Sequence, residues 1–206
     1  EIVLNDRRLL NGLARAWGIE EQFQDFTVAL DKWDKIGNDG VRKELGERGF
    51  APATIDRVMQ LFELLSTTDS SERLDGMKAL FAEGDEEANA AYQEVVELMA
   101  MAQGAGVDAT QLVFDPTLAR GLNYYTGAIF EVRVPDAPIG SICGGGRYAD
   151  LTGIFGWKGM SGVGISFGAD RIYDVLEHYD AFPQEALTQP QVLVVQMDEE
   201  GRTHAI

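Results

Sequence analysis

One of the few cations of an acidic chain stands close to two adjacent tyrosines. The stretch Leu118 to Gly127 reads LARGLNYYTG, with Arg120 four positions ahead of Tyr124 and Tyr125. A guanidinium can neutralise a carboxylate or a phosphate, and phenol hydroxyls can pair with a polar heteroaromatic group that their rings enclose. The combination predicts a pocket for a small anionic ligand. Because neighbouring side chains of a regular strand face opposite sides, both tyrosines can serve one ligand only if the backbone bends.

A second stretch carries three consecutive glycines, Gly144, Gly145 and Gly146, followed closely by Tyr148. Consecutive glycines weaken a strand and cost backbone entropy, so this place requires either bare backbone or positive φ angles. One interpretation is a ligand that lies against the glycines with Tyr148 at its edge. The other is a tight turn between a strand and a helix, and the stretch taken alone favours the turn.

A third stretch, GVGISFGADR from Gly162 to Arg171, predicts a strand followed by the start of a helix. Glycines at alternate positions leave one face of the strand without side chains, so a flat ring such as adenine can lie there. Arg171 stands at the junction of strand and helix, where it can pair with a phosphate through two parallel hydrogen bonds. The alternative is that the glycines only let a helix pack closely on the strand.

Composition restricts the class of protein that carries these stretches. The chain has 206 residues, of which 45% are apolar and 25% charged, as expected for a globular protein of one or two domains. Its formal net charge of −17 predicts weak nonspecific binding of nucleic acid. A single cysteine, Cys143, excludes an internal disulfide framework and predicts a reducing, cytoplasmic location. One cysteine and two distant histidines predict no structural zinc site, and no run of about 18 apolar residues predicts a membrane span.

The secondary structure predicted for the elements that position these residues changes from helix to strand near Gly104. Before it, apolar residues recur at helical spacing; Pro52 marks the first turn of one helix, and Ser70 or Ser71 could cap another. After it, short β-rich runs separated by turn residues predict strands at 111–115, 128–134, 140–145 and 162–168, and a helix at 169–178. The sequence therefore predicts an α+β fold with a helical module followed by a sheet domain.

In their order along the chain, these stretches resemble histidyl-tRNA synthetases, a family of class II aminoacyl-tRNA synthetases. LARGLNYYTG followed by IFE is similar to a signature of the family, and GVGISFGADR is similar to the third class motif. The resemblance covers nearly the whole chain and implies part of a class II antiparallel sheet with flanking helices. The first class motif, which builds the dimer interface, and the second, which supplies another ATP-binding arginine, are not found. The resemblance therefore implies an internal fragment.

The resemblance also implies a division of the chain. Residues 1–35 and 107–187 would belong to the catalytic domain, and residues 36–106 would form a helical insertion module. Residues 188–206 would be a linker and the start of an anticodon-binding domain. The full-length protein would be a homodimer without a membrane anchor.

The activity that the resemblance implies is histidine–tRNA ligation. Histidine and ATP, accompanied by Mg²⁺, give histidyl-adenylate, and the histidyl group then passes to tRNA-His. Arg120 would contact the substrate carboxylate and the α-phosphate and stabilise the charge that grows in the transition state. Ala149 interrupts the family's usual RYDG run and moves the acid to Asp150, so the resemblance assigns no role to that acid.

The other implied contacts divide between histidine and ATP. Tyr124 and Tyr125 would line the histidine pocket. Its floor would be formed by Gly144, Gly145, Gly146 and Tyr148. Arg171 would hold the distal phosphates of ATP, with Gly168 beneath the nucleotide.

Two other functions stay open at this point. Synthetase-like proteins also serve as regulatory subunits of ATP phosphoribosyltransferase in histidine biosynthesis, where they sense histidine without charging tRNA. The large helical insertion and the apparent start of an anticodon-binding domain favour the ligase. The second alternative is an acidic α+β module that mediates protein contacts, with glycines that serve packing alone.

Overall fold

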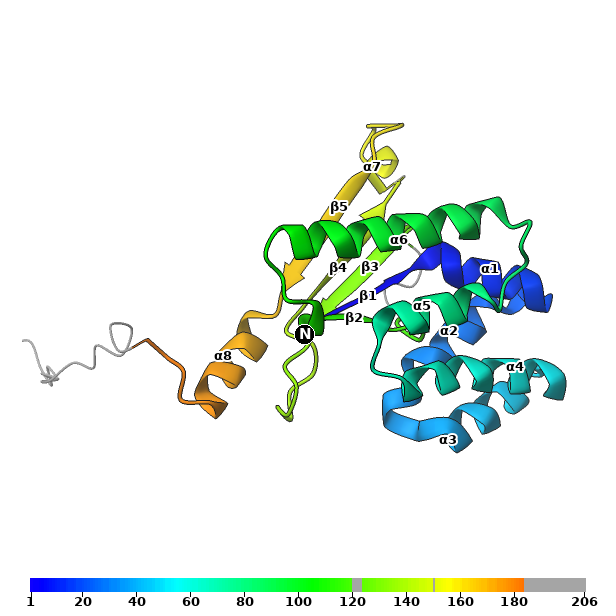
Figure 1. Cartoon of the computed structure of the whole chain (residues 1–206), viewed down its shortest axis with the longest axis horizontal. Coiled ribbons are helices and arrows are strands. Elements are labelled where there is room, and N and C mark those ends of the chain that lie inside the picture. The colour runs from blue at the N-terminus through cyan, green and yellow to red at the C-terminus, as the bar shows by residue number, and fades with distance from the viewer. Residues whose placement is uncertain (120–123, 150, 184–206) are drawn as a thin grey trace, which may run out of the picture.

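The computed structural model of the chain describes residues 1–119, 124–149 and 151–183. Within these residues five strands form one sheet, in the order β2-β1-β3-β4-β5 (Figure 1). The strands are β1 (Ile2–Asp6), β2 (Leu112–Phe114), β3 (Ala128–Val132), β4 (Cys143–Tyr148) and β5 (Gly162–Phe167). Helices flank the sheet, so the predicted α+β class is confirmed. The sheet is mixed rather than wholly antiparallel, because β1 and β2 run parallel while the other neighbours are antiparallel.

Most helices precede β2 in the chain. They are α1 (Arg7–Trp17), α2 (Phe23–Asp31), α3 (Trp33–Glu47), α4 (Pro52–Glu63), α5 (Ser70–Lys78) and α6 (Glu86–Gly104). The short α7 (Leu151–Ile154) lies between β4 and β5, and α8 (Ala169–His178) follows β5 as predicted. Asp69, rather than Ser70 or Ser71, caps α5, because its carboxylate accepts hydrogen bonds from the first free amides of the helix. No helix in the described part of the chain is long and apolar enough to cross a membrane.

Strand β1 is the element that helical periodicity does not predict. It lies between β2 and β3, and its first residue, Ile2, stands opposite Leu112 on one side and Val132 on the other. The strand has five residues and leads directly into α1, whose N-terminus is capped by Asp6. A strand this short, with all of its partners far along the chain, leaves little local signal in the sequence. The helical expectation before Gly104 is therefore wrong for residues 2–6.

A single apolar core joins the helices to one face of the sheet. Leu4 and Phe130 lie on that face and pack with residues of α1 and α6, which crosses the sheet (Figure 1). The same core continues through α2 to α5 and includes Leu45 and Leu61, both of which are fully buried. Residues on both sides of the boundary expected near residue 35 thus share one core, and the division into domains stays a prediction.

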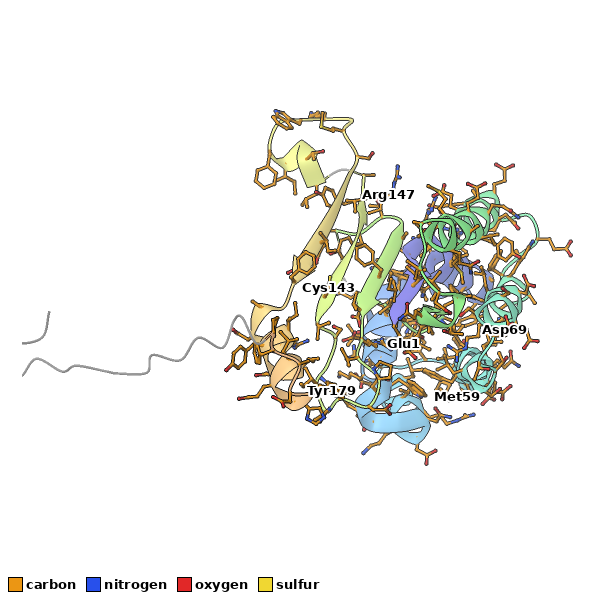
Figure 2. All side chains as sticks on the ribbon, turned by 60° about the vertical axis from the view of Figure 1, so that its left-hand side comes forward. Glu1, Met59, Asp69, Cys143, Arg147 and Tyr179 are labelled. Atoms are coloured by element: carbon orange, nitrogen blue, oxygen red, sulfur yellow. The ribbon has the colours of Figure 1, made fainter. Side chains whose placement is uncertain are left out.

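Strand β5 leaves its side chains exposed on the face that α6 covers elsewhere. The register aligns Phe130, Gly145 and Ile165 across three strands, so Ile165 points to the same side as Phe130. Val163, Ile165 and Phe167 are each more than half exposed. Figure 2 shows β5 standing away from the helices around Met59 and Asp69. The opposite face of β5 carries its glycines and Ser166.

Candidate ligand-binding site

Tyr124 and Tyr125 lie in an irregular segment directly before β3, so the bend that a shared ligand requires is present. Their ring centroids are 4.3 Å apart and the ring planes are tilted by 55°. Burial, together with a hydrogen bond to Tyr124, raises the pKa of Tyr125 to about 12. The Tyr125 phenol therefore keeps its proton at neutral pH and can donate a hydrogen bond to a ligand.

The three consecutive glycines lie inside strand β4, so the turn that their stretch alone favours is wrong. Gly146 faces the tyrosine segment, and a Cβ built there would lie 2.8 Å from Cδ1 of Tyr125. That distance is shorter than real Cβ contacts allow, so the ring requires bare backbone beneath it. Gly144 and Gly145 line the neighbouring cavity. The glycines thus serve close approach to the strand rather than a change of chain direction.

A flat ring does lie on the bare face of β5, and it belongs to Tyr148. A Cβ at Gly162 would lie 2.5 Å from Cε2 of Tyr148, and one at Gly164 would lie 3.3 Å from Cε1. The glycine face of β5, which the sequence predicts as a place for adenine, is therefore covered by the Tyr148 side chain. Tyr148 is not among the described residues that line the cavity.

Arg171 lies in the first turn of α8, at the predicted junction of strand and helix. Its Nη1 donates a hydrogen bond of 2.7 Å to the carbonyl oxygen of Ser141. This bond connects α8 to the residue two positions before β4. Arg171 and Gly168 open onto the same cavity as the tyrosines. The second and third stretches of the sequence meet through the pairing of β4 with β5, and Arg171 adds a bond to the loop before β4.

A cavity of about 270 Å³ brings most of the predicted site residues together. Its described lining consists of Tyr124, Tyr125, Phe130, Glu131, Ser141, Ile142, Cys143, Gly144, Gly145, Ser166, Gly168 and Arg171. Cys143 marks the start of β4 in Figure 2. Gly146 adjoins the cavity through its contact with Tyr125, whereas the ring of Tyr148 lies against Gly162 and Gly164, which are not among the described lining residues. Arg120 lies outside the described residues, as does Asp150.

Glu131 is a functional candidate that the sequence reasoning missed. It lies in β3 opposite Gly144 and is 2% exposed, yet it contributes to the cavity wall. Its Oε2 accepts a hydrogen bond of 3.2 Å from Nε of Arg133, and Nη1 of Arg133 also donates to Asp115 at 3.3 Å. An acid inside the apolar run AIFEV is the signal that could have revealed it, because a buried charge requires a partner.

Charge is distributed unevenly over the described cavity wall. Glu131 supplies a carboxylate and Arg171 supplies a guanidinium, while the remaining lining residues are uncharged. Such a wall suits a ligand that carries both an anionic group and a cationic or N–H donor group.

The chain matches known proteins over most of its length. The sequence model of the family described as Histidyl-tRNA synthetase matches residues 1–172. A relative named Histidine--tRNA ligase from Christiangramia forsetii is 44% identical over 206 residues, which is 100% of this chain and 44% of that protein. The chain thus spans less than half the length of this curated relative.

Two solved structures extend the comparison to three dimensions. The histidyl-tRNA synthetase of Nostoc sp. PCC 7120 is 30% identical, with a TM-score of 0.78 over 98% of this chain and 48% of that chain. A Bacillus halodurans protein described as an ATP phosphoribosyltransferase regulatory subunit/histidyl-tRNA synthetase is 22% identical, with a TM-score of 0.66 over 86% of this chain and 43% of that chain. The second likeness shows a common fold alone. On the match over residues 1–172, the chain belongs to the histidyl-tRNA synthetase family.

Proposed function

We propose that these residues form part of the catalytic centre of a histidine–tRNA ligase. The full-length parent protein joins histidine to ATP, releases pyrophosphate, and transfers the histidyl group from the adenylate to tRNA-His. In this proposal residues 36–106 are a helical insertion, residues 188–206 lead into an anticodon-binding domain, and the parent is a cytoplasmic homodimer. The 206 residues supply only part of that protein, since they span 44% of a curated relative.

One observation carries the proposal: the tyrosine pair, Gly144, Gly145 and Arg171 line a single cavity. Histidine presents a flat, polar ring and ATP presents phosphates, and this cavity offers phenols and glycines for the first and a guanidinium for the second. Tyr124 and Tyr125 would enclose the imidazole. The floor of the histidine pocket would be Gly144, Gly145, Gly146 and Tyr148.

The polyphosphate is assigned to the other end of the cavity. Arg171 would exchange its bond to the Ser141 carbonyl for the distal phosphates of ATP, with Gly168 beneath the nucleotide. Arg120 would hold the histidine carboxylate and the α-phosphate, so that charge developing between them is neutralised as the new bond forms. Among the described residues no group of three His, Cys, Asp or Glu side chains could hold a metal. Mg²⁺ would accompany the ATP, bound to its phosphates.

Pyrophosphate exchange tests the activity. The parent protein is expected to incorporate labelled pyrophosphate into ATP when histidine is present, and not with other amino acids. An analogue of histidyl-adenylate should also raise its melting temperature at saturating concentration, because a ligand that binds only the folded state stabilises it. A folded parent that shows neither effect would overturn the proposal. A parent that binds histidine but supports no exchange would instead favour the regulatory subunit.

A further inference from the structure

A buried, irregular turn leads into the tyrosine segment. Residues 115–119 follow β2 and are neither helix nor strand, yet all five are buried. Buried backbone polar groups need partners, because leaving one without a hydrogen bond costs free energy. The turn meets part of this need itself: Asp115 accepts hydrogen bonds from the amides of Thr117 and Leu118, through its side chain and its carbonyl respectively.

Asn5, on strand β1, supplies two further partners of this turn. Its Nδ2 donates hydrogen bonds to the carbonyl oxygens of Pro116 at 3.3 Å and Leu118 at 2.9 Å. The side chain is 1% exposed, and its Oδ1 accepts from the backbone amide of Asp6, which fixes its orientation. On the other side of Asn5, the carbonyl oxygen of Leu4 accepts a hydrogen bond from the amide of Asp115 at 2.9 Å.

Leu118 connects this turn to the site. Its side chain is buried in a small cluster with Val3 and Ile129, and the ring of Tyr125 packs against the same cluster. The far end of the tyrosine segment is also held from the start of α1, since the amide of Arg7 donates to the carbonyl oxygen of Gly127 at 3.0 Å. Both ends of the segment that carries the tyrosines are thus attached to residues 5–7.

We propose that Asn5 is a positioning residue for the ligand cavity. Its amide fixes the backbone at Leu118, the Leu118 side chain supports the ring of Tyr125, and Tyr125 lies on Gly146. Removing the amide leaves two buried carbonyls without their donor and lets the turn move. The consequence for histidine rests on the proposed function, whereas the fixing of the turn does not.

The experiment compares Asn5→Ala with Asn89→Ala in the full-length parent. Asn89 is a control for the loss of two side-chain hydrogen bonds, because its Nδ2 also donates to two backbone carbonyls, those of Glu83 and Asp85, at 2.9 and 2.8 Å, but at a half-buried position. It lies on α6 and belongs to no part of the cavity. Amide hydrogen exchange is followed for the turn and for β3. If Asn5→Ala does not fold, Asn5→Ser replaces it, since a serine is too short to reach both carbonyls.

Exchange at Thr117 and Leu118 is expected to become at least about tenfold faster in the Asn5 variant, while the β3 amides keep their rates. The control is expected to change neither. The KM for histidine should rise about tenfold with the KM for ATP within about twofold of wild type. When Tyr125→Phe is added, the combined loss should be smaller than the product of the two separate losses, because both act through one ring.

Three results would overturn the proposal. They are unchanged exchange at Leu118, equal acceleration in the turn and in β3, and losses that multiply when Tyr125→Phe is added. A wild-type parent without histidine-dependent activity would overturn the proposed function and the substrate part of this inference with it. Hydrogen exchange would still decide in that case whether Asn5 holds the turn.

Discussion

The guanidinium of Arg171 is the cavity's cationic group among the described lining residues, and its present partner is neutral. A backbone carbonyl attracts a guanidinium less strongly than a phosphate does, because the phosphate carries a full negative charge and can accept two parallel hydrogen bonds. The bond to Ser141 can therefore hold the side chain in place for a nucleotide and then be replaced. Arg171 also shows how one side chain can serve both the loop before β4 and a ligand.

The first prediction concerns this exchange of partners. In the full-length parent, Arg171→Ala is expected to raise the KM for ATP by about tenfold or more while the KM for histidine changes much less. The reason is the loss of a charge-assisted contact to the distal phosphates. Pyrophosphate exchange at varied ATP concentration measures it. Tyr179→Phe is the control, because it removes a nearby hydrogen bond to the carbonyl oxygen of Pro135 without touching the cavity. An unchanged ATP constant would remove Arg171 from the nucleotide site.

Residues differ in how visible their roles are in the sequence. Arg171 and the tyrosine pair carry chemistry in their side chains and stand beside glycines, so the sequence predicts them as site candidates. Glu131 is hidden within an apolar strand, and only its burial beside Gly144 brings it to the cavity. The role of Asn5 is harder still to predict from the sequence, because the two carbonyl groups to which it donates belong to residues that follow the whole helical region along the chain. Contacts between segments that are far apart along the chain produce no local residue pattern from which they could be predicted.

At the scale of elements, Asp85 joins two helices. It caps α6, where its carboxylate accepts a hydrogen bond from the amide of Ala88 at 3.0 Å. The same carboxylate also accepts a hydrogen bond of 2.7 Å from Nε of Arg15 in α1. The pKa of Asp85 is lowered, chiefly by the hydrogen bond from Arg15 and further by the capped amides. The start of α6, which crosses the sheet, is therefore tied to α1.

The second prediction is that Asp85→Ala lowers the free energy of unfolding by about 1 to 2 kcal/mol, the usual cost of a lost N-cap. Asp85→Asn is expected to cost less at pH 7, because asparagine still caps a helix but carries no charge for Arg15. The folded-state pKa of Asp85 lies below its unfolded value of about 3.9. The charge-dependent stability is thus present above about pH 4 and is lost as the pH falls through the folded value.

Denaturant unfolding at two pH values tests whether the stability contributed by the Asp85 charge is lost on acidification. At pH 7 the wild type should be more stable than Asp85→Asn, and the difference should shrink progressively as the pH falls below about 4. A difference that grows on acidification would contradict the ion pair as its source. Glu87→Gln is a suitable comparison, since Glu87 also pairs with Arg15 but is largely exposed and should contribute little.

The elements also show why some of the fold could be predicted and some could not. Helices α4 and α6 repeat apolar residues at helical spacing over several turns, so their existence follows from local pattern. Strands β3 and β5 are bounded by turn residues and were predicted within a few positions. Strand β1 is defined only by its pairing with β2 and β3, both of which come after the helical region. The failure to predict β1 from the sequence matters for function, because β1 contains Asn5 and is followed directly by Arg7, whose amide binds the tyrosine segment.

At the scale of the whole molecule, the exposed apolar face of β5 contrasts with a chain of net charge −17. Val163, Ile165 and Phe167 lie on the side of the sheet that α6 covers near β1 and β3. Within the described residues β5 is also the edge of the sheet, with backbone groups available for another strand. Contiguous exposed apolar surface of this kind is typical of an interaction site. The relatives' additional length makes the rest of the parent the expected cover.

The third prediction uses one substitution in two contexts. Ile165→Ala should cost about 2 to 5 kcal/mol of unfolding free energy in the full-length parent, where we expect the side chain to be buried. In the 206-residue chain, where Ile165 is 55% exposed, the change should stay within about 0.5 kcal/mol. Denaturant unfolding of the four proteins gives the comparison. Equal costs in both contexts would mean that the parent leaves this face open.

The fourth prediction concerns activity without the rest of the parent. The resemblance to the family places an ATP-binding arginine and the dimer-forming motif outside these residues, so Arg171 would meet ATP without that second cation. Loss of one group that stabilises transition-state charge typically lowers kcat by about 10²- to 10³-fold. The 206-residue chain is therefore expected to catalyse histidine-dependent pyrophosphate exchange at least about 10³-fold more slowly than the parent. Exchange at a rate comparable to the parent's would show that the cavity lined by Tyr125 and Arg171 is sufficient for activation by itself.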